Sequence, residues 1–225
     1  MALQPSLRPL LIAGRPDAPH TLDIFLDYVC PFRLLLSLQA LASTDIFLLV
    51  ISGKLSVTVD KIVKPLVDVG GKYEGKVKII FRNQVQPWHG SSTFTHEAGL
   101  AVARVAPEKF WPFSLLLLQR QGEYYDIPTS DLSPIQIREK LASLFAETGV
   151  SGDRVESFKD LLKLKSTPNG GVSVTDELKY TIKFSRQNGV HVSPSVLWDG
   201  ILASEVSSSW GEAEWTQFFA QKVAV

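Results

Sequence analysis

The sequence predicts an α/β fold in which a helical block separates two groups of strands. An apolar run at residues 22–29 and an alternating, then apolar, run at 76–85 are typical of strands, and residues 57–66 between them have helical character. Two short apolar runs within residues 195–203 flank a turn, as in a hairpin. The strands therefore come from both ends of the chain, as expected when a helical segment is inserted into an α/β core.

The first half of this core reads strand, helix, strand. The strand at 22–29 runs directly into Cys30-Pro31-Phe32, and a Gly70-Gly71 break separates the helical stretch from the strand at 76–85. The block that follows, from about residue 91 to 174, has the spacing of helices rather than the alternation of strands. The expected helices are at residues 95–105, 107–120, 134–147 and 153–165.

The second half returns to the sheet. Thr175 begins a helix, and Asp199-Gly200 is the turn of the hairpin. Ser209, followed three residues later by Glu212, matches a capping box that opens a last helix at residues 210–222. The order is then helix, strand, strand, helix.

Cys30 is the only cysteine of the 225-residue chain, and it lies where a strand gives way to an expected helix. The N-terminus of a helix favours a thiolate over a thiol, so this position suits a reactive sulfur. A buried structural cysteine is the alternative, because free cysteines are among the most buried residues.

A second motif lies far along the chain: residues 188–200 read Asn-Gly-Val-His-Val-Ser-Pro-Ser-Val-Leu-Trp-Asp-Gly. Together with Cys30-Pro31-Phe32, it resembles the DsbA-like family of thioredoxin-fold proteins over nearly all of residues 21–221. The resemblance implies a thioredoxin-like core at 20–90 and 174–225, with a helical insertion at 91–173. It also implies a cis Ser193–Pro194 bond facing Cys30.

The resemblance further implies a thiol-disulfide oxidoreductase with Cys30 as its nucleophile. Pro31 and Phe32 would contact the substrate, the Ser193 backbone would pair with an extended peptide or glutathione, and Pro194 would shape that edge. A single cysteine cannot resolve its own mixed disulfide, so glutathione or a protein thiol is the expected co-substrate, with no bound cofactor. A non-catalytic binding module and a glutathione-dependent transferase or isomerase remain alternatives.

Residues 33–51 depart from the family pattern as an apolar insertion. Without them, Cys30-Pro31-Phe32 would join Ser52 and form the family's Cys-x-x-Ser spacing. The segment is either an intron-derived or alternative-exon insertion, or a genuine helix at 31–41 followed by a strand-like piece at 46–51. A membrane span is disfavoured by Asp45 and the other polar residues.

Three more residues are candidates for the site. Trp88 and His89 follow the strand at 76–85, so they would share a sheet edge with Cys30 if the two strands are parallel, and His89 could then assist proton transfer. His191 precedes Ser193 and could line the same cleft. For each of these residues a packing or surface role is the alternative. The four histidines lack metal-ligand spacing, so no zinc site is expected.

Composition narrows the function classes. The chain has 23 basic and 23 acidic residues, which gives no electrostatic basis for binding nucleic acid or an anionic membrane. The N-terminal apolar run is too short for a signal peptide, and a lone thiol suits a reducing compartment. We therefore expect a cytoplasmic protein without a membrane span. The sequence leaves the oligomeric state open.

Overall fold

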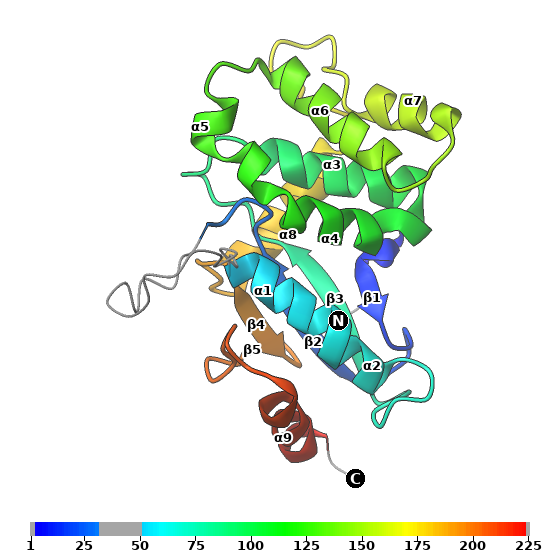
Figure 1. The fold of residues 1–225 in the computed structure, drawn as a ribbon, viewed down its shortest axis with the longest axis vertical. Helices are drawn as coiled ribbons and strands as arrows, with labels where there is room; N and C mark the ends of the chain where they lie inside the picture. The colour runs from blue at the N-terminus through cyan, green and yellow to red at the C-terminus, as the bar shows by residue number, and fades with distance from the viewer. Residues whose placement is uncertain (1–2, 32–50, 224–225) are drawn as a thin grey trace, which may run out of the picture.

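The computed structural model describes residues 3–31 and 51–223 of the chain (Figure 1). The predicted helix and strand at 31–41 and 46–51 therefore lie almost wholly outside the described residues. The described part contains one five-stranded sheet in the order β1-β3-β2-β4-β5. The strands are β1 (Leu11–Ala13), β2 (His20–Leu26), β3 (Val77–Asn83), β4 (Ser195–Trp198) and β5 (Ile201–Leu202).

The strands β2 and β3 run parallel, and the other pairs are antiparallel. A parallel pair needs a crossover, and the described part of this one, from residue 51 onward, contains three consecutive helical segments. These are α1 (Ile51–Thr58), the π-helical segment η2 (Val59–Val63) and α2 (Lys64–Val67). The predicted strand, helix, strand order is confirmed, and the polypeptide chain leaves β2 and β3 at the same end of the sheet.

The remaining α-helices divide between the helical block and the return to the sheet. Figure 1 shows α3, α4, α6 and α7 stacked beyond one end of the sheet, α8 behind it, and α9 beside β4 and β5. The helices are α3 (Ser92–Val105), α4 (Phe110–Gln119), α5 (Asp126–Thr129), α6 (Pro134–Ala146), α7 (Gly152–Leu161), α8 (Thr175–Gln187) and α9 (Glu212–Lys222). Short 3-10 helices are η1 (Pro5–Leu10), η3 (Pro107–Lys109) and η4 (Gln121–Tyr124).

Both faces of the sheet are covered, because successive side chains of a strand point to opposite faces. Phe25 packs with Phe184 of α8, with ring centroids 6.1 Å apart, in a small cluster that also contains Leu197. Leu22 and Ile24 belong instead to the main core. Burial on both faces explains why β2 reads as a nearly continuous apolar run rather than a strict alternation.

Two local features differ from the sequence prediction. The N-terminal segment forms η1 and β1, which pairs antiparallel with β3 at the sheet edge, although its Pro-containing sequence gave no clear strand signal. Helix α9 begins at Glu212 rather than residue 210, and its first turn is capped differently: the Gly211 N–H donates to the Glu214 carboxylate at 2.9 Å. The predicted Ser209 cap is wrong, because the Ser209 backbone instead bonds Ser207.

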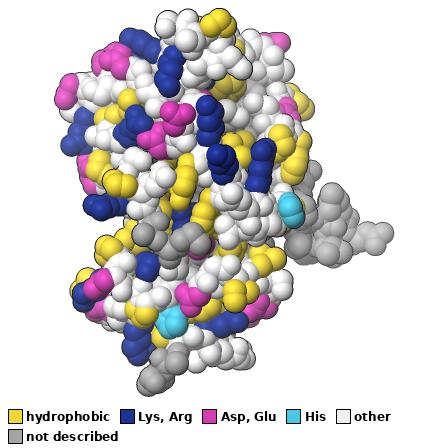
Figure 2. Space-filling view, turned by 180° about the vertical axis from the view of Figure 1, so that it is seen from behind, with side chains coloured by type: hydrophobic (Ala, Val, Ile, Leu, Met, Phe, Trp, Pro, Cys, Tyr) yellow, Lys and Arg dark blue, Asp and Glu magenta, His cyan; other side chains and the backbone are white. Residues whose placement is uncertain are grey.

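The described surface has no single charge sign on the face in Figure 2, where basic and acidic side chains are interspersed. Some exposed basic and acidic side chains also pair directly, as in Arg15–Asp17 and Lys163–Asp160. No helix within residues 3–31 and 51–223 has both the length and the apolar character needed to cross a bilayer.

Candidate active site

Cys30 lies four residues beyond the end of β2, and only 4 % of it is exposed. Its Sγ donates to the carbonyl oxygen of Ser193 at 3.4 Å, a sulfur hydrogen bond between segments 163 residues apart. The Ser193–Pro194 peptide bond is cis, as the resemblance implied. The two motifs singled out in the sequence therefore meet in space, with the thiol against the carbonyl that precedes Pro194.

The loop that carries Ser193 is held in place at both ends. Gly189 adopts a φ of +67°, a left-handed conformation that ends α8. After Pro194, Ser195 pairs with Phe25 in the antiparallel β2–β4 register. In between, the Ser193 hydroxyl accepts the backbone N–H of Asp27 at 2.7 Å, which joins the loop to the end of β2.

Asp27 is the centre of a buried polar cluster beside the cysteine, and its side chain is fully buried. One carboxylate oxygen, Oδ1, accepts the Val29 N–H at 3.1 Å and the Ser92 hydroxyl at 3.0 Å. The other, Oδ2, lies 3.0 Å from Nδ1 of His89. A carboxylate removed from water is stable only when its oxygens are paired in this way.

His96 of α3 is the second histidine that faces Asp27. Its Nδ1 lies 2.8 Å from the amide nitrogen of Asn83, and its Nε2 lies 3.5 Å from Oδ1 of Asp27. An amide nitrogen only donates, so Nδ1 of His96 is the acceptor and Nε2 carries the proton that faces Asp27. The ring also contacts Tyr28, with centroids 4.8 Å apart.

The electrostatics of this cluster favour an ionised Asp27. Burial raises the pKa of Asp27, but the interactions with His96 and His89 and the Val29 N–H lower it by more, so the net shift is downward from 3.8. Asp27 is therefore a buried anion faced by groups from three segments of the chain: Val29 after β2, His89, and helix α3.

A pocket of about 460 Å³ opens beside Cys30. It combines residues that flank the cysteine, the histidine that contacts Asp27, and the aromatic and apolar residues around α5. The lining residues are Val29, Pro31, His89, Tyr124, Tyr125, Asp126, Ile127 and Pro128. A small thiol compound or a side chain of a peptide would fit a pocket of this size and composition.

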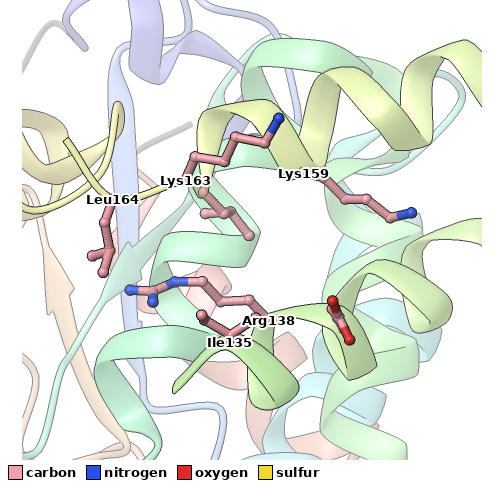
Figure 3. Close-up of a pocket in the computed structure, with 7 residues that line it drawn as sticks. Ile135, Arg138, Lys159, Lys163 and Leu164 are labelled. Carbon is pink, nitrogen blue, oxygen red and sulfur yellow. The ribbon is translucent and has the colours of Figure 1, made fainter. Parts of the chain in front are cut away.

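A second pocket, of about 280 Å³, lies in the helical block between α6 and α7 (Figure 3). Arg138, Lys159 and Lys163 line it together with Ile135, Leu162 and Leu164. Each of these cations already has an acidic partner: Glu97, Glu156 and Asp160, respectively. The pocket shares no lining residue with the one beside Cys30.

The structure brings some of the predicted site residues together. The region around the ends of β2 and β3 contains Cys30, Pro31, Ser193, Pro194 and His89. Because the two strands are parallel, His89 lies at the same end of the sheet as Cys30 and lines a pocket with its neighbours Val29 and Pro31.

The other predicted residues are exposed at the surface, or their side chains lie outside what the structure describes. Trp88 is 60 % exposed and stands edge-on to His89, and His191 is exposed. Ser52 lies in the first turn of α1, with its side chain not described. Phe32 and most of the 33–51 segment lie outside the described residues.

Asp27 and His96 were not among the site residues predicted from the sequence. Both carried a signal: Asp27 is an acid within an apolar run, three residues before the cysteine, and His96 lies among small and apolar residues of a predicted helix. A polar or charged side chain in a buried segment needs a polar partner, and Asp27 and His96 face each other at 3.5 Å. Among the residues that the structure describes, no group of histidine, cysteine and acidic side chains has the arrangement of a metal site.

The chain is similar to several solved structures. A proposed protein-disulfide isomerase from Pseudomonas syringae aligns with a TM-score of 0.67 and 21 % identity, over 95 % of this chain and 98 % of that one. The chain has the thioredoxin-like fold of DsbA-like proteins. The thiol-disulfide oxidoreductase MdbA from Actinomyces oris aligns with a TM-score of 0.60 and 14 % identity, over 100 % of this chain and 93 % of that one.

A third DsbA-like structure supports the same fold. DsbA from Mycobacterium tuberculosis, in its reduced form, aligns with a TM-score of 0.55 and 15 % identity, over 100 % of this chain and 91 % of that one. No protein-family model and no curated protein sequence matches the chain. At these identities the comparisons establish the fold, and the chemistry is argued from the residues of this chain.

Proposed function

We propose that this DsbA-like chain is a thiol-disulfide oxidoreductase that acts through Cys30 alone. The observation that carries the proposal is the contact of Cys30 Sγ with the Ser193 carbonyl, directly before the cis bond to Pro194. This contact joins the only thiol of the chain to the loop with the cis bond, which supports Cys30 as the nucleophile. The solved structures described as thiol-disulfide oxidoreductases support the same chemistry.

The reaction is a disulfide exchange. The Cys30 thiolate attacks one sulfur of a disulfide, the sulfur–sulfur bond breaks, and the second sulfur leaves as a thiolate. Because the chain has one cysteine, a thiol from solution, either glutathione or a protein thiol, must attack the mixed disulfide and restore Cys30. In this proposal the pocket beside Pro31 receives the substrate, the Ser193 backbone aligns it, and Pro194 shapes the edge. A reducing compartment such as the cytoplasm suits this cycle.

The test is adduct formation with oxidised glutathione, followed by intact-mass measurement and peptide mapping. We expect one glutathione on Cys30 of the folded protein, released by reduced glutathione, and none on a Cys30→Ala variant. If the folded protein forms no adduct while the urea-unfolded protein does, Cys30 is a structural thiol and the fold serves as a binding module. Conjugation of glutathione to an aromatic electrophile, without disulfide exchange, would favour the transferase alternative.

A further inference from the structure

The pocket beside Cys30 contains a histidine whose two ring nitrogens lie in different surroundings. Nδ1 of His89 faces the buried Asp27 carboxylate at 3.0 Å, whereas the His89 side chain, 14 % exposed, lines the pocket next to Pro31. Because an ionised carboxylate only accepts hydrogen bonds, Nδ1 must carry the proton. In neutral His89, Nε2 therefore holds the lone pair and is the nitrogen available to a molecule in the pocket.

The backbone around His89 is fixed on both sides. Its own N–H donates to the Gln86 carbonyl at 3.1 Å, and the next residue, Gly90, donates its N–H to the Asp126 carboxylate at 3.0 Å. Asp126 begins α5 and lines the same pocket. The histidine is thus held between the end of β3 and α5 with its tautomer set by Asp27.

His96 is not suited to the same role. It is fully buried, with Nδ1 occupied by Asn83 and Nε2 facing Asp27, so both ring nitrogens are directed to the interior. His96 supports the carboxylate, and of the two histidines only His89 lines the pocket. The two histidines face different oxygens of Asp27, His89 at hydrogen-bond distance and His96 at 3.5 Å.

We propose that His89 transfers the proton in disulfide exchange at Cys30 and that Asp27 is its positioning residue; this inference rests on the proposed function. Nε2 of His89 takes the proton of the Cys30 thiol, and the resulting thiolate attacks the disulfide. As the sulfur–sulfur bond breaks, the imidazolium gives the proton to the leaving thiolate. The step consumes one disulfide, forms one mixed disulfide and one thiol, and returns His89 to its neutral form.

The test compares two reactions of the same sulfur. Exchange with oxidised glutathione releases a thiolate that takes up a proton, whereas alkylation by iodoacetamide releases iodide, which needs none. The ratio of the two rates at one pH therefore cancels any change in the amount of Cys30 thiolate. We expect His89→Asn, whose amide can still donate to Asp27, to lower this ratio about 10- to 100-fold. The matched control is His20→Asn, at the start of β2, because Nδ1 of His20 also faces a carboxylate, that of Asp199 at 2.8 Å, and His20 does not line the pocket; this variant should leave the ratio unchanged.

A second variant separates proton transfer from structure. His89→Ala should show the same low ratio, and added imidazole should restore it, which a purely structural role of His89 would not allow. An unchanged ratio in both variants, or equal loss of both rates without rescue by imidazole, would overturn the inference. If the wild-type protein forms no glutathione adduct at all, it is the proposed function that fails, whatever the variants do.

Discussion

The hydroxyl of Ser193 accepts the backbone N–H of Asp27 at 2.7 Å, so the loop before Pro194 and the end of β2 are held together by a buried hydrogen bond. The same two residues carry the functional contacts on either side: the Ser193 carbonyl meets the thiol of Cys30, and the Asp27 carboxylate meets His89. One hydrogen bond thus links the Ser193–Pro194 loop, which contacts Cys30, to Asp27, which contacts the proposed proton-transfer residue His89.

Replacement of Ser193 tests this link. Ser193→Ala leaves the buried Asp27 N–H without its acceptor, so we expect the free energy of unfolding to fall by about 1–3 kcal/mol in urea titrations. Ser195→Ala is the matched control: its hydroxyl bonds the Val192 carbonyl at an exposed position, and the loss should stay below about 0.5 kcal/mol. Equal effects of the two variants would mean that the Ser193 bond adds nothing to stability.

The buried Asp27 carboxylate makes stability depend on pH. Its pKa is lower in the folded than in the unfolded chain, so it stabilises the fold above about pH 4, and this contribution is lost as the pH falls through the folded pKa. The groups that face it, His89 and His96, are present in both wild type and Asp27→Asn. We therefore expect Asp27→Asn to be less stable at pH 7 and the gap from wild type to narrow below pH 4.

Urea unfolding at several pH values measures this gap. The control is Asp131→Asn, since Asp131 is exposed, and its difference from wild type should stay nearly constant with pH. A gap for Asp27→Asn that widens as the pH falls would contradict the ionised state assigned to Asp27.

The packing of α3 against Tyr28, two residues beyond β2, leaves room only for a glycine at position 99. A Cβ at Gly99 would lie 2.8 Å from the Tyr28 hydroxyl, which is buried and bonds the Ser114 hydroxyl at 2.7 Å. Gly99→Ala should therefore destabilise the protein by about 1–3 kcal/mol, although alanine is the better helix former. Gly152→Ala, at the first residue of α7 with open space around it, should be neutral or stabilising. A stabilising Gly99→Ala in thermal unfolding would show that Tyr28 moves freely.

Removal of residues 33–51 tests the hypothesis that they interrupt the motif. The deletion places Ser52 directly after Phe32 and forms the Cys-x-x-Ser spacing. If this spacing sets Cys30 at a helix N-terminus, its thiolate fraction at neutral pH and its alkylation rate should rise about tenfold over the full-length chain. The control carries Ser52→Ala in the same deletion. An unchanged rate in a folded deletion variant would count against the hypothesis.

The sequence predicted the fold well because its signals are local. Strand β3, the hairpin around Asp199-Gly200 and the start of α6 at Pro134 each follow from a few neighbouring residues. The site was predicted only in part. Cys30 and Ser193 stood out through their motifs, but the role of Asp27 depends on partners 62 and 65 residues away, and no local pattern joins it to His89 and Ser92.

The measurement that tests the central claim most directly is the pH dependence of iodoacetamide alkylation at Cys30, with Cys30→Ala as the blank. We predict a rate that has already reached its plateau near neutral pH, because transfer of the thiol proton to Nε2 of His89 leaves Cys30 as a thiolate there. A rate that rises only above about pH 8, or no reaction in the folded state, would contradict it and make Cys30 a structural thiol.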